Sequence, residues 1–285
     1  MPTLDFMGRT LCYEHFGAPT WDDRSPVFVF VSSEYRDTLT MMPILRQMPD
    51  QISGVIVDST NMGGSTRLDR PLTRQEVIAE LTHACQALKI HRPVFIGYCS
   101  TAELALHATT AMDGAGLLVV SPFFRRRASG LVDMFYAALK RTILARDAYT
   151  LTVLMNLVDP HSRALRETEN HFLKDQFANQ KLLQDADHFW IKTLQCKPAG
   201  DFAWDDLSAF ARRVLILRGS EDTLQPITFL SSQLRDPWHE LVEFENGHQI
   251  LNHKLPDVVR HMCAFSQSLR LPDEALVPEA AAWTN

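Results

Sequence analysis

The stretch Pro93-Val-Phe-Ile-Gly-Tyr-Cys-Ser-Thr101 decides the fold of this chain. It opens with a short apolar run of strand length, and residues 101–111 continue with the apolar spacing of a helix. Only residues 97–100 lie between the two, so the chain must turn sharply there. We therefore predict a buried strand, a tight turn that carries Cys99, and a helix that starts directly behind it.

Apolar runs of the same kind recur at residues 26–33, 54–58, 116–121, 214–219 and, in shorter form, 240–245. Their apolar residues do not alternate with polar ones, which is typical of parallel strands covered on both faces. Residues 74–88 carry one apolar stripe at helical spacing, and Thr73 with Glu76 matches a capping box. We expect an α/β fold with a mostly parallel central sheet and helices on both faces, preceded by a hairpin at residues 4–13.

The alternation of strands and helices stops between residues 124 and 207, where only amphipathic helical stretches follow one another. A helical insertion at this point would lie across the carboxyl edge of the sheet, where open α/β sheets bind ligands. We predict that residues 124–207 form a helical cap or lid on a core made of residues 1–123 and 208–270. Residues 271–285 are rich in Pro, Ala and Glu, and we expect a frayed tail.

The bulk properties argue against several classes of protein. The 285 residues carry a net charge of −6, which argues against a nucleic-acid surface. The five cysteines are scattered without a C-x-x-C pair, so we expect reduced thiols in a cytoplasmic protein. No signal-like start and no apolar run of membrane-spanning length occurs. No metal-binding motif occurs either, so we expect neither a metal nor another cofactor, and a homodimer is compatible with the sequence.

Cys99 is the candidate nucleophile. The turn would place its thiol at the N-terminus of a helix, where the helix dipole and free N–H groups favour a negative charge. A thiol in such a place has a lowered pKa, so we expect Cys99 to be partly ionised at neutral pH. Thr101 stands where the G-x-S-x-G pattern of nucleophile turns has glycine, and its branched side chain should strain or open the turn. The alternative is that Cys99 is a buried structural cysteine.

Two further residues have the order and spacing of a catalytic triad. Asp222 follows the apolar run at residues 214–219, with Glu221 as the alternative acid, and His248 follows the run at residues 240–245. Both would lie at the same sheet edge as Cys99, where open α/β sheets hold their sites. His248 would accept the thiol proton, and Asp222 would fix the orientation of the imidazole.

The remaining candidates surround this triad. We expect the backbone N–H of Ser100 to be one oxyanion donor and that of Glu34, or of Ser33 beside it, to be the other. The Glu34 side chain should then point outward. Aromatic residues of the cap could line an acyl tunnel, although they suit the cap's own core as well. The candidates for substrate contact are Tyr98, Phe123, Phe135 and Trp190.

With these residues in place, the chain resembles the α/β-hydrolase superfamily over nearly its whole length. The loop Asp58-Ser-Thr-Asn-Met-Gly-Gly-Ser65 is similar to the D-x-x-G-x-G-x-S loop of that superfamily. The segment Gly97-Tyr-Cys-Ser100 resembles the nucleophile box of polyhydroxyalkanoate synthases, which also carry cysteine. The size and the helical cap are more similar to small thioesterases and acyltransferases.

The resemblance implies an acyl-transfer enzyme that acts on an acyl thioester held on coenzyme A or an acyl carrier protein. Its acyl group would pass to Cys99 and then to water or to an acceptor, because exchange between a thioester and a thiol is nearly isoenergetic. Two alternatives stay open, since one fold hosts many chemistries. The first is a carboxylester or lactone hydrolase, and the second is a hydrolase-like binding protein whose thiol is catalytically silent.

Overall fold

The computed structural model describes residues 1–34, 36–123, 130–147, 150, 185–197, 210, 212–222, 234 and 238–270. A single eight-stranded sheet runs through these residues in the order β1-β2-β4-β3-β5-β6-β7-β8. Strands β1 and β2 form the predicted antiparallel hairpin, β2 pairs antiparallel with β4, and every later pair is parallel. The strands are β1 (Thr3–Phe6), β2 (Arg9–Gly17), β3 (Val27–Val31), β4 (Ser53–Asp58), β5 (Pro93–Tyr98), β6 (Gly116–Val120), β7 (Arg213–Gly219) and β8 (His239–Phe244).

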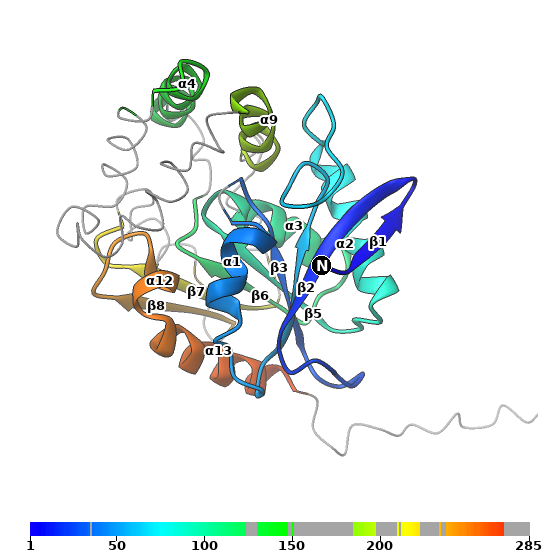
Figure 1. Ribbon diagram of the computed structural model, residues 1–285. Coiled ribbons are helices and arrows are strands. Elements are labelled where there is room, and N and C mark those ends of the chain that lie inside the picture. The colour runs from blue at the N-terminus through cyan, green and yellow to red at the C-terminus, as the bar shows by residue number, and fades with distance from the viewer. Residues whose placement is uncertain are drawn as a thin grey trace, which may run out of the picture.

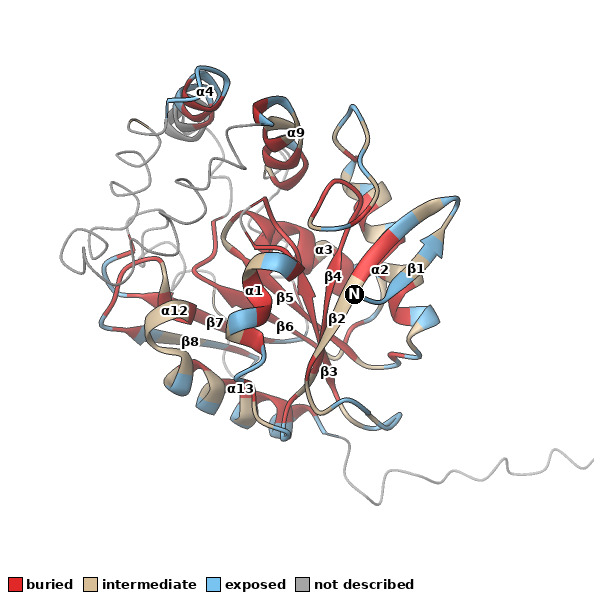
Figure 2. Cartoon of the chain, viewed as in Figure 1, coloured by how far each residue is buried: buried red, intermediate tan, exposed pale blue. Residues whose placement is uncertain are grey.

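Helices cover both faces of this sheet, as the unalternating apolar runs predict (Figure 1). In β3, Val27, Val29 and Val31 belong to the core formed with α2 and α3, whereas Phe28 and Phe30 belong to the core formed with α1 and α13. Strands β3 to β7 are buried along nearly their whole length, whereas β1, β2 and β8, toward the edges of the sheet, are only partly buried (Figure 2). The helices of the core are α1 (Thr38–Leu45), α2 (Arg74–Ala87), α3 (Ala102–Ala111), α12 (Ile250–His253) and α13 (Leu255–Leu269).

The capping box and the helix start predicted from the sequence are both present in the structure. Thr73 caps α2 through a hydrogen bond from the backbone N–H of Glu76, and the Glu76 side chain reaches back to Thr73, which is the predicted capping box. Helix α3 begins after a single turn of 3₁₀ helix, η1 (Cys99–Thr101), which joins it directly to β5. The chain therefore passes from strand to helix at the predicted turn.

Most of the predicted cap, residues 124–207, lies outside the described residues, as does the tail at 271–285. Two described helices fall within the range predicted for the cap, α4 (Gly130–Leu144) and α9 (Ala186–Cys196), and they pack against each other. In Figure 1 they lie together beyond one end of the strands. Helix α9 is tied to the core by Gln195, whose side chain donates to the carbonyl of Thr60 and accepts from Asn61 and from the backbone of Leu72. These buried hydrogen bonds fix the position of α9 relative to the core.

Five segments that leave the sheet at its carboxyl edge position the candidate site. They follow β3, β5, β6, β7 and β8, which are neighbours in the sheet and all parallel. Because parallel strands present their carboxyl ends on one side, side chains far apart in sequence meet there. Among the described helices, none is long and apolar enough to cross a membrane.

Candidate active site

Cys99 occupies a left-handed backbone conformation, with φ of 49°. A residue with a side chain adopts this conformation at a cost of about 1–3 kcal/mol and keeps it only where its surroundings enforce it. Gly97 helps to hold this conformation because it leaves room for close packing. A Cβ at position 97 would lie 2.6 Å from the Cα of Ala102. The end of β5 and the start of α3 can therefore approach each other only because position 97 is glycine.

Thr101 closes the turn instead of straining it, which corrects the expectation from the sequence. Its hydroxyl accepts a hydrogen bond from the backbone N–H of Tyr98 at 3.0 Å and donates to the Tyr98 carbonyl at 3.0 Å. The side chain is fully buried, and its own φ of −89° is unstrained. The Thr101 hydroxyl thus supplies a bridge across the turn that glycine could not.

The segment after β6 supplies a second hydrogen bond that stabilises the turn at Cys99. The backbone N–H of Phe123 donates to the carbonyl of Cys99 at 3.0 Å. The Phe123 ring is buried and lies 6.5 Å, between centroids, from the ring of Tyr136 on α4. Phe123, predicted as a substrate contact, therefore lies beside the turn and joins it to α4.

Asp222 and His248 form a buried, hydrogen-bonded pair. The distance between His248 Nδ1 and Asp222 Oδ2 is 2.8 Å, and the two residues are 3% and 4% exposed. The alternative acid, Glu221, is exposed to solvent. Gly219 makes the pairing possible, because a Cβ there would lie 2.0 Å from the carbonyl oxygen of Gly247. The two loops after β7 and β8 therefore pass each other in direct backbone contact.

The electrostatics of His248 reflect its neighbours. Burial by itself would lower the pKa of His248, but the negative charges of Asp222 and of Cys99 in its thiolate form outweigh it. The pKa of His248 is consequently held well above its ordinary value. Since Nδ1 is bonded to Asp222, Nε2 is the ring nitrogen that this pairing leaves for another partner.

Tyr98 holds the histidine loop rather than a substrate, which corrects its predicted role. Its ring is 3% exposed, and its hydroxyl donates to the carbonyl of His248 at 3.0 Å. Ser121, after β6, donates to the same carbonyl at 2.7 Å. The guanidinium of Arg36 lies 4.9 Å from the centre of the Tyr98 ring and bonds the side chain of Gln249. These contacts fix the backbone from which the imidazole projects.

The turn after β3 also differs from the prediction. The backbone N–H of Ser33 donates to the Arg36 carbonyl at 2.9 Å, so it is engaged within its own turn and does not serve as an oxyanion donor. Glu34 points inward rather than outward, is 5% exposed, and accepts a hydrogen bond from Ser100 Oγ at 3.0 Å. The backbone N–H of Glu34 acts on its own carboxyl group and lowers the pKa of that group. The backbone N–H of Ser100 stays a predicted donor, since Ser100 directly follows Cys99 in η1.

The buried position of Glu34 changes its acidity. Burial raises the pKa of Glu34, while hydrogen bonds from its own backbone, from Cys196 and from Ser100 and the charge of Lys192 act in the opposite direction. Cys196 and Lys192 belong to α9, so the carboxyl lies where the core meets the cap. The Ser100 contact joins the turn after β3 to the nucleophile turn.

Of the substrate contacts predicted in the cap, Trp190 belongs to α9 and faces α4. Lys140 of α4 places its ammonium 5.6 Å from the centre of the Trp190 ring, which favours a role in cap packing. The side chain of Phe135 lies outside the described residues. His188 of α9 bonds the carbonyl of Asn61 at 3.1 Å and so belongs to the seam between α9 and the core.

Sequence reasoning missed four contributors to the site: Ser121, Arg36, Gln249 and Cys196. Ser121 had a detectable signal, because it follows an apolar run directly, at the edge where the other candidates gather. All five cysteines are free. Within the part of the chain that the structure describes, no group of three or more His, Cys, Asp or Glu side chains could hold a metal ion.

Taken together, the parallel sheet, the strained residue between β5 and α3, and the acid–histidine pair after β7 and β8 define a nucleophile-turn α/β protein. A family model described as the alpha/beta hydrolase family matches residues 17–261, and the chain belongs to that family. No curated protein matches it in sequence.

Many solved structures share the fold. An α/β-hydrolase enzyme, MGS-M2, from a Medee basin deep-sea metagenome library is 16% identical, with 96% of this chain and 100% of that chain covered and a TM-score of 0.76. A thermophilic esterase from Thermogutta terrifontis is 16% identical, with 94% and 97% covered and a TM-score of 0.72. A thioesterase domain from the curacin biosynthetic pathway is 14% identical, with 93% and 98% covered and a TM-score of 0.60.

Proposed function

We propose that this member of the alpha/beta hydrolase family is an acyl-transfer enzyme that acts on an acyl thioester through a covalent intermediate on Cys99. One observation carries the proposal. A cysteine holds the strained φ of 49° at the start of α3, at the sheet edge where the buried Asp222–His248 pair lies. Such strain in a residue with a side chain concentrates at functional sites.

The proposed reaction has two halves. In the first, His248 Nε2 takes the proton of the Cys99 thiol, and the sulfur attacks the carbonyl carbon of the thioester. The bond from that carbon to the leaving sulfur breaks, and the imidazolium returns the proton to the leaving thiolate. In the second, His248 takes a proton from water or from an acceptor hydroxyl, and the oxygen attacks the carbonyl carbon of the acyl-cysteine. The bond from that carbon to the Cys99 sulfur breaks, and the imidazolium returns the proton to this sulfur. Asp222 stabilises the imidazolium in both halves.

Cysteine favours a thioester substrate over an oxygen ester. Exchange of an acyl group between two sulfurs is nearly isoenergetic, so the acyl-enzyme keeps enough reactivity to pass the group on. The proposed partner is therefore a small acyl thioester on coenzyme A or an acyl carrier protein. The likeness to a thioesterase domain is compatible with this substrate.

The second candidate is a carboxylester hydrolase. It is favoured by the esterase from Thermogutta terrifontis, which has a higher TM-score than the thioesterase domain. Both reactions would use the same residues, so the geometry of the triad does not separate them and the preference must be measured.

The test is a panel of acyl-coenzyme A and p-nitrophenyl esters, with turnover measured and adducts detected by intact-protein mass spectrometry and peptide mapping. We expect an acyl adduct on Cys99, no turnover by Cys99→Ala, and weak activity in Cys99→Ser. Cys263→Ala is the control, because this thiol is also partly exposed but lies on α13.

Each outcome has a clear meaning. Turnover of p-nitrophenyl esters alone would replace the thioester proposal by the carboxylester hydrolase. Binding of thioesters with neither adduct nor turnover would make the chain a catalytically silent binding protein. Unchanged turnover in Cys99→Ala would remove Cys99 from the mechanism altogether.

A further inference from the structure

A buried polar link runs from the cap helix α9 to the nucleophile turn. Ser100 Oγ donates to Glu34 Oε2 at 3.0 Å, and the thiol of Cys196 lies near enough to the same carboxyl group to lower its pKa. The three residues are 4%, 5% and 1% exposed. They come from three separate segments, η1, the turn after β3, and the last residue of α9. Hydrogen bonds buried in this way are shielded from competing water and are costly to leave unmade.

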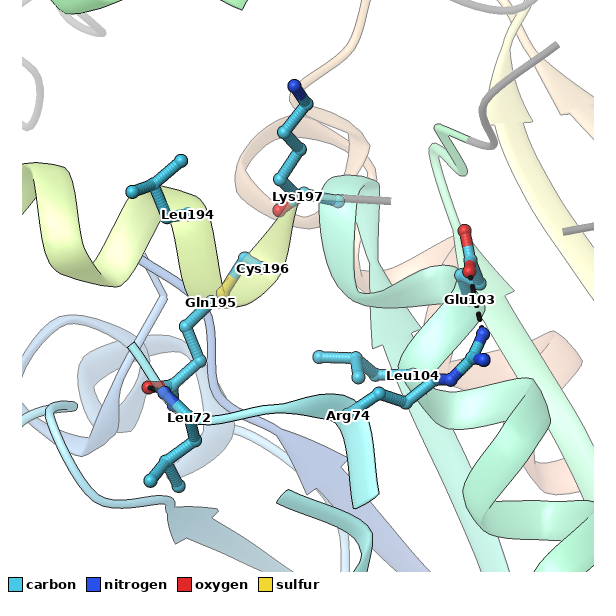
Figure 3. A pocket seen from close by; sticks show the side chains of 9 residues that line it. Leu72, Arg74, Glu103, Leu104, Leu194, Gln195, Cys196 and Lys197 are labelled. Carbon is cyan, nitrogen blue, oxygen red and sulfur yellow. Dashed lines mark hydrogen bonds and ion pairs between the residues drawn. The ribbon is translucent and has the colours of Figure 1, made fainter. Parts of the chain in front are cut away.

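On the side that faces α9, the side chain of Ser100 is not fully surrounded by packed atoms. A pocket of about 120 Å³, partly open to solvent, lies between α9 and the first turn of α3. Figure 3 shows Cys196 on its α9 wall and Leu104 and Arg74 on its core wall, and Ser100 lines it as well. A side chain beside empty space lacks van der Waals partners there. Its polar bond to Glu34 must therefore contribute more to its position than it would in a close-packed core.

The position of Ser100 matters because its backbone N–H follows Cys99 directly and is the predicted oxyanion donor. Such a donor stabilises the charge that develops in the transition state only when it lies within hydrogen-bond reach of the oxyanion. We propose that Glu34 is a positioning residue, whose carboxyl group holds Ser100 and thereby the N–H beside Cys99. Cys196 holds the carboxyl in turn, so α9 supports the nucleophile turn. This inference rests on the proposed function, since it assigns Glu34 to the acylation of Cys99.

The charge around the carboxyl is compatible with that role. An ionised carboxylate near the nucleophile turn would oppose a developing oxyanion, and Lys192 of α9 supplies a positive charge that counters it. Lys192 is also within 3.9 Å of Asp37, so it lies between two acids. Glutamine at position 34 would keep a hydrogen-bond acceptor for Ser100 and remove the ionisation. Glu34→Gln should therefore retain the positioning, whereas Glu34→Ala should lose it.

The test measures acylation of Cys99 by butyryl- and decanoyl-coenzyme A in single turnovers. We expect Ser100→Ala and Glu34→Ala each to lower the acylation rate by about tenfold to a hundredfold with little change in KM, the pattern of a misplaced transition-state contact. The double variant should be no slower than the slower single variant, because both changes remove one shared bond. Glu34→Gln should stay within about threefold of the unaltered protein.

Glu80→Gln is the matched control. Glu80 is also fully buried, and it accepts hydrogen bonds from the Thr60 hydroxyl at 2.6 Å and from the Thr60 backbone at 2.8 Å. Its contacts are with Thr60 and Arg9 rather than with the nucleophile turn. We expect a loss of thermal stability in this variant without a change in acylation rate.

Two results would overturn the inference alone: normal acylation in Ser100→Ala, or losses in Ser100→Ala and Glu34→Ala that multiply in the double variant. Ser100→Ala removes one hydroxyl and should fold even where Glu34→Ala does not. Absence of any adduct on the unaltered protein would overturn the proposed function, and this inference with it.

Discussion

Replacing Thr101 by valine tests how the nucleophile turn is held. Valine has nearly the same shape but no hydroxyl, so the buried backbone N–H of Tyr98 loses the acceptor that it has at 3.0 Å. A buried donor left without its partner costs about 1–3 kcal/mol. A chain of 285 residues has an unfolding entropy of about 0.6 kcal/mol/K, so a loss of about 2 kcal/mol should lower Tm by about 3 °C.

The measurement is thermal unfolding followed by circular dichroism, with Thr101→Ser as the matched control. Serine keeps the hydroxyl and loses only a methyl group, so it should retain more of the stability than valine does. Because Cys99 lies between the two bonded residues, the valine variant should also acylate more slowly. A valine variant as stable as the unaltered protein, or a serine variant less stable than the valine variant, would refute the role assigned to the hydroxyl.

The remaining predictions concern the acid, the loop crossing and a buried carboxyl group. Asp222→Asn should lower kcat by up to about 10⁴-fold, since it removes the acceptor that fixes the tautomer of His248. Glu221→Gln should leave kcat within about twofold of the unaltered protein. Equal effects of the two changes would reject Asp222 as the acid of the triad. Gly219→Ala should abolish turnover and lower Tm, because its Cβ would lie 2.0 Å from a carbonyl oxygen; normal turnover would mean that the loops can separate. Burial, followed by the charge of Asp37, raises the pKa of Asp58 to about 7 from a usual 3.8, so the folded chain keeps a proton that the unfolded chain releases. The stability linked to Asp58 is therefore complete below pH 3.8 and is lost as the pH rises to about 7. When urea midpoints are measured across this pH range, Asp58→Asn should show a smaller decline than the unaltered protein. An equal decline in the two proteins would contradict the prediction.

Much of the fold follows from local patterns in the sequence. The apolar runs predict β3 to β8, and the lack of alternation predicts a sheet covered on both faces, because a buried parallel strand needs apolar side chains on both sides. The order of Cys99, Asp222 and His248, each directly after such a run, predicts that they gather at one edge. The structure brings Asp222 and His248 to 2.8 Å and leaves Cys99 in the strained turn.

Side-chain orientations at that edge were decided only by the tertiary structure. Glu34 points inward because Ser100, from a distant part of the chain, offers it a hydrogen bond that solvent would otherwise supply. Tyr98 faces the His248 carbonyl rather than a substrate for the same reason.

Strand and helix periodicity depends on residues that are close together in the sequence, so it can be recognised from the sequence alone. It determined the class of fold and the position of the turn between β5 and α3, and it predicts the members of the proposed triad. The partner of a buried polar group, in contrast, depends on which segments meet after folding, and no local pattern records it. That is why Thr101 was expected to strain the turn that its hydroxyl in fact closes.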